Sequence, residues 1–249
     1  MAVMNWLPRG SGDGDTGNKM NIFVQPTEPH IKEGIWIETD KSFIDILITE
    51  PITDDYDYTK MNNLPYTFTN GSTSTVDTDI YLFGGGTTTT TRKNCYKYNT
   101  TSNTYTKMLD IPYEFYSGST SVVGNDVYLF GSGAGGSTSI NCYKYNTLSN
   151  TYTKMLDIPY GFYLGSTSVV GNDVYLFGGG DISTFTNCYK YDTISNTYTK
   201  MLDIPYAFRI NNSTSTVGTD IYLFGSGTTT TTFTNCYKYD TISNTYTKM

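Results

Sequence analysis

A repeat of about 47 residues occupies most of this 249-residue chain and limits what it can fold into. The peptide Ile-Tyr-Leu-Phe-Gly at residues 80–84 recurs, with Val or Ile first, from Val127, Val174 and Ile221, each 47 residues after the one before. The peptides Asn-Cys-Tyr-Lys-Tyr and Tyr-Thr-Lys-Met recur with it, so residues 62–249 hold four near-identical units. A period of this length is the signature of an architecture in which one supersecondary unit stacks on its neighbours.

Each unit is predicted to form four short strands. Short β-branched and aromatic runs bounded by Gly, Asn and Asp favour strands over helices. Pro112, Pro159 and Pro205 follow the fourth strand and prevent it from continuing. No segment shows a helical period with caps. In the second unit the expected strands are residues 118–123, 127–130, 141–145 and 151–155.

A four-stranded unit of this size cannot cover both of its own faces. Units stacked around an axis cover one another, which predicts a four-unit β-propeller and an all-β chain. The glycines after the second strand allow the backbone to approach closely near a crowded axis. Two forms remain open: a closed four-bladed ring, and an open arc that another subunit completes.

These units resemble kelch repeats, whose pattern is a hydrophobic strand, a Gly-Gly pair, a Tyr and then a Trp. Here the matching residues are Ile80–Gly85, Tyr98 and Tyr105, and the likeness covers residues 62–249. It implies a kelch-like propeller, although that family commonly has six or seven blades. Tyr replaces the expected Trp in every unit, and Ser replaces the second Gly in two units, at Ser132 and Ser226.

The N-terminal part differs in composition from the repeats. Residues 1–20 are glycine-rich and polar and are expected to form an extended arm. Residues 21–61 are expected to form a small β attachment module, because alternating apolar residues predict three strands at 21–25, 34–38 and 43–48.

The stretch from Ile22 to Pro29, together with Gly34–Ile37, resembles the start of tail-associated proteins from bacteriophages and prophages of clostridia. The resemblance implies that this segment joins other tail or baseplate proteins, with Phe23, Trp36 and Ile37 as candidate attachment residues. It also implies that the chain is a homo-oligomer within a virion or phage-tail-like particle and is made in the bacterial cytoplasm.

Charge and hydropathy exclude several partners. The net charge is −7, whereas nucleic acids and anionic membranes attract basic surfaces. No run of 18 apolar residues is present, so no membrane insertion is expected. The first nine residues lack the apolar core of a secretory signal peptide.

The sequence does not support catalysis, a cofactor or a metal. The kelch family includes a copper radical oxidase whose site resembles two His, two Tyr and a Tyr–Cys crosslink, but His30 is the one histidine here. The Asp boxes of sialidases are absent. The aspartates that precede each Ile-Pro pair are expected to accept hydrogen bonds within turns. The four cysteines occupy one equivalent strand position in different units, and they are Cys95, Cys142, Cys188 and Cys236. They are expected to lie too far apart to form a disulfide and to be buried as small apolar residues.

One face of the propeller is the candidate binding face. The loops between strands two and three and the links from strand four to the next unit should share this face, and they differ among the copies, whereas the opposite turns are nearly uniform. Loops on a rigid scaffold usually carry binding. The alternative is that these loops simply tolerate drift. The candidate contact residues are Glu114, Tyr116, Tyr163, Arg209, Arg92 and Asp181, whereas Phe68, Phe115, Phe162 and Phe208 are expected to pack between blades.

The leading functional expectation is a non-enzymatic tail component that presents the propeller to a host-surface carbohydrate or protein. The second is a purely structural virion or baseplate subunit whose propeller packs against other proteins. A carbohydrate-active enzyme is the third and remote alternative, because the residue sets that it needs are missing.

Overall fold

The computed structural model describes residues 18–22, 35–39, 59–133, 138–180, 185–227 and 234–249. The chain divides into two compact units, Met1–Thr59 and Lys60–Met249. The regular secondary structure of the described residues is β-strand, apart from one 3-10 turn, η1 (Thr91–Lys93). The predicted all-β class is therefore confirmed.

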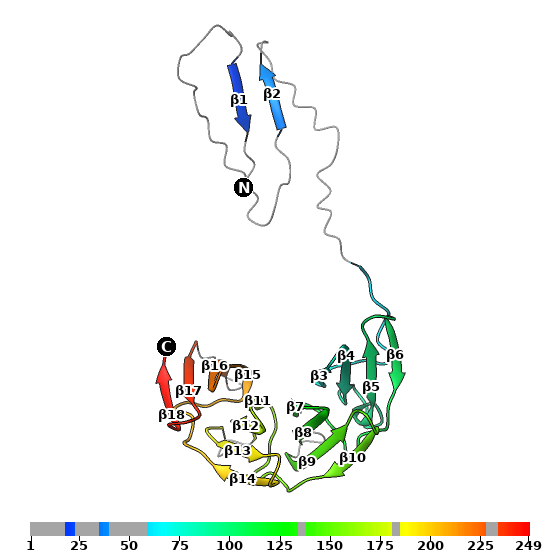
Figure 1. Cartoon of the computed structure of the whole chain (residues 1–249), viewed down its shortest axis with the longest axis vertical. Helices are drawn as coiled ribbons and strands as arrows, with labels where there is room; N and C mark the ends of the chain where they lie inside the picture. The colour runs from blue at the N-terminus through cyan, green and yellow to red at the C-terminus, as the bar shows by residue number, and fades with distance from the viewer. Residues whose placement is uncertain (1–17, 23–34, 40–58, 134–137, 181–184, 228–233) are drawn as a thin grey trace. The chain divides into compact units, whose positions relative to one another are not determined.

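Each repeat forms one four-stranded antiparallel sheet with its strands in sequence order, which we call blades 1 to 4. Figure 1 shows the blades following one another along an arc, with the first strand of each nearest the centre. This arrangement confirms a propeller-like fold. The strands are β3 (Ser72–Val76), β4 (Asp79–Phe83), β5 (Cys95–Asn99) and β6 (Thr104–Lys107) in blade 1; β7 (Ser119–Val123), β8 (Asp126–Ser132), β9 (Ser139–Asn146) and β10 (Thr151–Lys154) in blade 2; β11 (Ser166–Val170), β12 (Asp173–Phe177), β13 (Cys188–Asp192) and β14 (Thr197–Lys200) in blade 3; and β15 (Ile210–Val217), β16 (Asp220–Gly227), β17 (Cys236–Asp240) and β18 (Thr245–Lys248) in blade 4.

The N-terminal unit contains one antiparallel pair, β1 (Asn18–Ile22) and β2 (Ile35–Thr39), with Met20 opposite Ile37. The second predicted strand agrees with β2 to within a residue. The first was placed too late, because β1 begins at Asn18 inside the segment expected to be an arm. Polar Asn18 and Lys19 can pair as strand because backbone groups, rather than apolar side chains, make the ladder. The third predicted strand lies outside the described residues.

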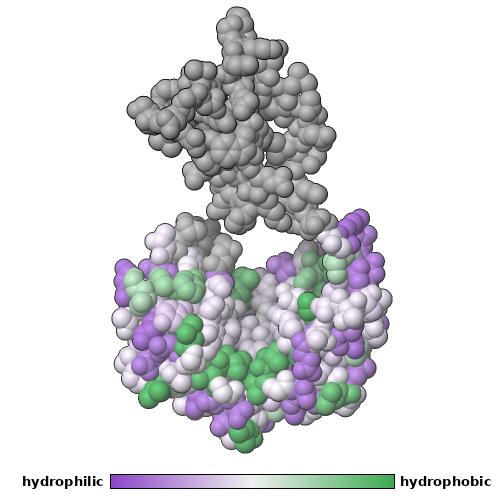
Figure 2. All heavy atoms as spheres, turned by 45° about the horizontal axis from the view of Figure 1, so that its top comes forward, coloured by the Kyte–Doolittle hydropathy of each residue, from purple (hydrophilic) through white to green (hydrophobic). Residues whose placement is uncertain are grey.

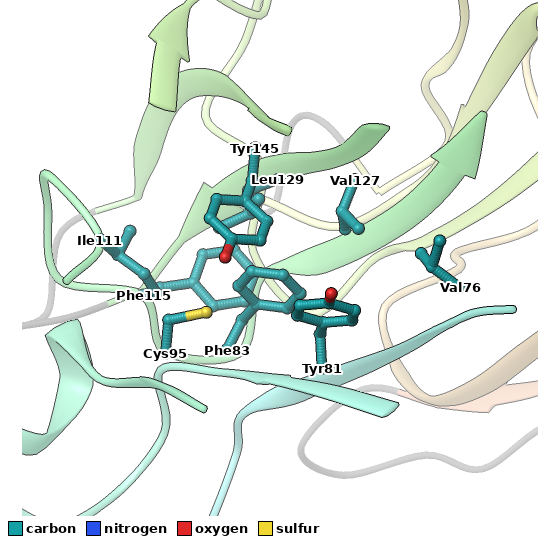
Figure 3. Packing of buried hydrophobic residues seen from close by; sticks show 9 residues of the cluster. All are labelled: Val76, Tyr81, Phe83, Cys95, Ile111, Phe115, Val127, Leu129 and Tyr145. Carbon is teal, nitrogen blue, oxygen red and sulfur yellow. The ribbon is translucent and has the colours of Figure 1, made fainter. Parts of the chain in front are cut away.

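The hydrophobic core lies between the blades (Figure 3). Blades 1 to 3 each contribute a forward face, made in blade 1 by Tyr81, Phe83 and Cys95. It packs on the rear face of the next blade, made in blade 2 by Val127, Leu129 and Tyr145. Equivalent residues make the second and third interfaces. Three aromatic and aliphatic layers therefore connect the four sheets, because alternate strand residues point to opposite faces.

The innermost strands are joined by hydroxyl groups instead of apolar side chains. The Ser72 and Ser74 hydroxyls lie 2.7 and 2.9 Å from the Thr120 hydroxyl, which donates to the Thr73 carbonyl of the neighbouring blade at 3.3 Å. The same pattern continues from blade 2 to blade 3 through Thr167 and from blade 3 to blade 4 through Thr214. The Ser-Thr-Ser runs of the sequence thus form a polar ladder between adjacent inner strands.

The glycine that ends each second strand is required by a close approach to the next link. Gly131 has φ +67°, and a Cβ there would lie 2.0 Å from the Phe162 carbonyl oxygen. Gly84 and Gly178 have the same conformation against Phe115 and Phe208. An L side chain would meet both a strained backbone and a steric clash.

The two serines that replace the second glycine lengthen their strands. β8 and β16 continue past the phenylalanine to Ser132 and Gly227, whereas β4 and β12 stop at the phenylalanine. In blade 2 the extension begins with a register irregularity between Phe130 and Ser132, and Ser132 pairs with Ser139. The serine hydroxyl also accepts a hydrogen bond from the backbone of a link between blades, which glycine cannot do.

Candidate binding face

The links between blades place one variable residue directly after a buried phenylalanine. Phe115, Phe162 and Phe208 are fully buried, which confirms that they pack between blades. The residues that follow them in the links are partly exposed, and they are Tyr116, Tyr163 and Arg209. The buried ring therefore anchors each link and fixes the direction of the residue after it.

Three of the predicted contact residues meet between blades 1 and 2. The Arg92 guanidinium carbon lies 4.7 Å from the centre of the Tyr116 ring, and Arg92 Nη1 lies 3.4 Å from Glu114 Oε2. The Asn70 side-chain amide donates to the Tyr116 hydroxyl at 2.6 Å. Arg92 belongs to the loop of blade 1, whereas Glu114 and Tyr116 belong to the link, so the cluster joins the two variable segments.

Two further candidates meet between blades 3 and 4. The Arg209 guanidinium carbon lies 5.5 Å from the centre of the Tyr163 ring and 4.9 Å from the centre of the Phe185 ring. Tyr163 also lies against Gly133, where a Cβ would come within 2.0 Å of the tyrosine ring. The link residues of blades 3 and 4 and the loop of blade 3 thus form one cluster, in which Tyr163 and Arg209 are partly exposed and Phe185 is buried.

The two clusters use the same positions with the residue types exchanged. Arg92 and Phe185 each lie three residues before the strand-three cysteine, and each accepts a backbone hydrogen bond from the following link phenylalanine. Tyr116 and Arg209 each follow that phenylalanine. A cation on the loop covers an aromatic ring on the link in one case, and the reverse holds in the other. Two of the three boundaries between blades thus carry a cation–aromatic contact between these positions, whereas Ser139 holds the loop position at the boundary of blades 2 and 3.

Serines missed as functional candidates in the sequence hold this face in place. The Ser132 hydroxyl accepts the Tyr116 backbone N–H at 3.1 Å, and the Ser226 hydroxyl accepts that of Arg209 at 2.9 Å. Their replacement of a motif glycine is a sequence signal that could have marked them. Phe185 and Asn70, which complete the two clusters, carry no such signal because their contacts depend on the folded loops.

Both guanidinium groups keep hydrogen-bonding capacity. Each guanidinium has five donors in a planar fork. Arg92 Nε and Arg209 Nε are buried without a hydrogen-bond partner among the described residues, so the donors that can face a partner are those on the terminal Nη atoms. The one carboxylate paired with them there is Glu114, whose side chain is 31% exposed. The face thus offers aromatic edges, guanidinium donors and one carboxylate, which suits recognition of hydroxyl, amide or anionic groups.

The uniform turns between strands three and four have a structural role. The Asn150 side-chain oxygen accepts both the Tyr145 hydroxyl at 2.9 Å and the Leu109 backbone N–H of the preceding link at 3.0 Å. Asn103, Asn196 and Asn244 repeat these contacts. The turns therefore meet the preceding link at each blade boundary, which explains why they vary so little.

Acidic residues support two of these turns. Asp192 Oδ1 accepts the backbone N–H groups of Ser195 and Ile194, and Asp240 does the same in blade 4. The hydrogen bonds from the serine backbone, followed by those from isoleucine, lower the pKa of both carboxyls. Asparagines at positions 99 and 146 make the corresponding turns of blades 1 and 2.

Three of the four cysteines are buried, as predicted, and Cys236 is partly exposed. Burial raises the pKa of Cys95, Cys142 and Cys188 to about 12. Each thiol faces the strand-four tyrosine of the next blade, so that Cys95 meets Tyr152. This contact gives the strand-four tyrosine a packing role at the interface.

Asp181 and Phe23 lie outside the described residues, and Trp36 and Ile37 lie in β2. Within the described ranges, no group of three His, Cys, Asp or Glu side chains is arranged to hold a metal ion. The same ranges contain no helix with the length and apolar character needed to span a membrane.

Comparison with known proteins gives a fold and no family. No protein-family model matches the chain, and no curated protein matches it. Among solved structures, that of YjhT is similar, with a TM-score of 0.65 and 15% sequence identity over 76% of this chain and 67% of that chain. At this identity the likeness supports the propeller-like fold alone.

Proposed function

We propose that this chain is a non-enzymatic component of a bacteriophage tail or phage-tail-like particle. Its N-terminal segment attaches to other tail or baseplate proteins, and its kelch-like propeller binds a carbohydrate or protein on the host surface through the variable loops and links. The resemblance of the segment around residues 22–37 to clostridial phage tail proteins supports the location.

The observation that carries the binding role is the convergence of Arg92, Glu114 and Tyr116, together with that of Tyr163 and Arg209, on variable segments held by a uniform scaffold. Arg and Tyr are frequent in binding hot spots because they combine flat apolar surface with directional hydrogen bonds. A uniform scaffold with variable loops is the arrangement expected when a partner selects the loops.

The test is adsorption of the particle to host cells. Glu114→Gln removes the charge and leaves the shape, and Arg209→Lys keeps the charge and removes the planar stack. Both variants are expected to fold and to reduce adsorption. Melting temperatures and particle incorporation are measured in parallel, so that loss of folding or assembly is not mistaken for loss of binding. Unchanged adsorption by both variants would contradict the binding role.

A structural subunit is the second candidate, because a repeated set of apolar side chains is exposed. Figure 2 shows hydrophobic residues in separate patches between hydrophilic ones. The exposed apolar residues include Leu148, Ile194 and Ile242 at the tips of the turns between strands three and four. If neighbouring particle proteins cover these tips, replacing the three with serine should reduce incorporation of the chain, and the Glu114→Gln variant should incorporate normally.

A further inference from the structure

The forward face of blade 4 is exposed although it is built from the same residues as the covered forward faces. Phe224 is 44% exposed, whereas Phe83, Phe130 and Phe177 are fully buried. Val217 is 66% exposed, compared with 7% for Val76 in blade 1. Cys236 is likewise the one partly exposed cysteine of the four.

The rear face of blade 1 is open in part, since Leu82 and Tyr98 stay buried at 4 and 8% exposure while other residues on it are exposed. Leu64 is 45% exposed, whereas its counterparts Ile111, Ile158 and Ile204 are 1 or 2% exposed. Ile80 is partly exposed, although Val127, Val174 and Ile221 at the same position are fully buried.

The polar ladder of the inner strands ends at the same two faces. Ser215 of blade 4 is exposed, whereas the equivalent Ser74, Ser121 and Ser168 are buried. Ser213 is exposed as well, whereas its equivalents in the other blades are partly buried. Thr73 of blade 1 is exposed, although Thr120, Thr167 and Thr214 each accept or donate hydrogen bonds across a blade boundary. Both end faces therefore carry apolar and polar groups arranged for another blade.

We infer that these two faces form one interaction surface for a polypeptide that presents two consecutive blades of the same kind of repeat. The first of those blades packs its rear face on Phe224 and Cys236, and the second packs its forward face on Leu64 and Ile80. The interface chemistry is continuous with the three interfaces inside this chain, so the surface selects a forward face of Tyr, Phe and Cys and a rear face of Val or Ile, Leu and Tyr.

The size of the occupant follows from the structural comparison. The matched 76% of 249 residues is about 189 residues, and if these make up 67% of YjhT, about 93 residues of that chain remain. This remainder is close to two units of 47 residues. A second whole copy of this chain would bring four blades, twice the number that this remainder allows. Two blades cover both faces, which makes a two-blade segment the better occupant.

The test lengthens the chain by its own repeats and counts reactive thiols. A five-unit variant carries residues 109–155 after Met249, and a six-unit variant carries residues 109–201 there; both junctions reproduce the natural Met-Leu link. Native protein is labelled with a maleimide at low concentration, the number of fast-labelling thiols is read by intact mass, and peptide mapping identifies them.

The four-unit chain is expected to show one fast-labelling thiol, Cys236. The five-unit chain should also show one, now on the appended unit, with Cys236 protected. The six-unit chain should show no fast-labelling thiol, because the forward face of its last unit then packs on the rear face of blade 1. One fast-labelling thiol in the six-unit chain, or none in the five-unit chain, would overturn the two-blade occupant. Protection of Cys236 in the four-unit chain would overturn it as well, and a dimer mass would then identify a second copy as the occupant.

Discussion

Arg92 stacks on Tyr116 across the boundary of blades 1 and 2, with its guanidinium carbon 4.7 Å from the ring centre. At the boundary of blades 3 and 4 the equivalent positions hold Phe185 and Arg209, 4.9 Å apart by the same measure. The pair is thus a cation–aromatic contact in either orientation. It connects the variable loop to the variable link, so the candidate binding face is also part of the scaffold.

The exchange of residue types predicts a rescue. Phe185→Arg alone places two guanidinium groups together, and Arg209→Tyr alone removes the cation, so each should destabilise the protein. The double variant recreates the Arg–Tyr pair and should recover about 0.5–1 kcal/mol relative to the sum of the single changes. Chemical denaturation measures the coupling. A coupling of zero would show that the two residues do not support each other.

Two glycines with the same backbone conformation separate strain from steric clash. Gly124 has φ +60° and open space around its Cβ position, whereas Gly131 has φ +67° and the Phe162 carbonyl oxygen 2.0 Å away. Gly124→Ala should lower the free energy of unfolding by about 1–2 kcal/mol, because alanine is strained in the left-handed conformation. Gly131→Ala should lower the free energy of unfolding by about 1–3 kcal/mol more than Gly124→Ala, since the link that carries Phe162 must move to make room for the methyl group. Equal unfolding free energies would contradict the close approach.

Matched phenylalanines test the packing between blades. Phe130→Ala removes a fully buried ring and should cost about 3–5 kcal/mol in the free energy of unfolding. Phe224→Ala changes the same residue type in the same motif, but that ring is 44% exposed, so the cost should be much smaller. Thermal or urea unfolding of the two variants provides the comparison, and similar losses would mean that blade 4 is covered as fully as blade 2.

The aspartate turns predict part of the acid sensitivity. Backbone hydrogen bonds lower the pKa of Asp192 and Asp240 in the folded state below the ordinary value of 3.8. Their contribution to stability is therefore fully present above that value and is lost as the pH falls through the folded-state pKa. The double variant Asp192→Asn, Asp240→Asn copies the turns of blades 1 and 2 and should lose less stability on acidification below pH 3.8. A parallel acid profile for both proteins would contradict this assignment.

Much of the fold could be predicted from the repeat. The strand positions followed from alternation and turn residues, and the burial of Cys95, Cys142 and Cys188 followed from their equivalent positions. These features depend on local sequence and on the need of each sheet for a neighbour, both of which a repeat makes visible.

Other features depend on the folded context and could not be predicted in this way. Phe83 and Phe224 have the same motif around them, yet one is buried and the other is exposed, because exposure depends on whether a further blade is present. The stacking of Arg92 on Tyr116 joins residues from different segments, and a comparison of copies gives their positions without their contact. Ser132 looked like a departure from a motif, but it extends β8 and holds the Tyr116 backbone.

The central claim is that each sheet is protected by its neighbours rather than by its own strands. Hydrogen–deuterium exchange tests this directly, because the residues Tyr-Leu-Phe occur in β4, β8, β12 and β16, each time preceded by Ile or Val, and therefore have nearly the same intrinsic exchange rates in each blade. Blades 2 and 3, which are covered on both faces, are expected to exchange most slowly, and blade 4 faster. Equal protection of all four peptides would contradict the account.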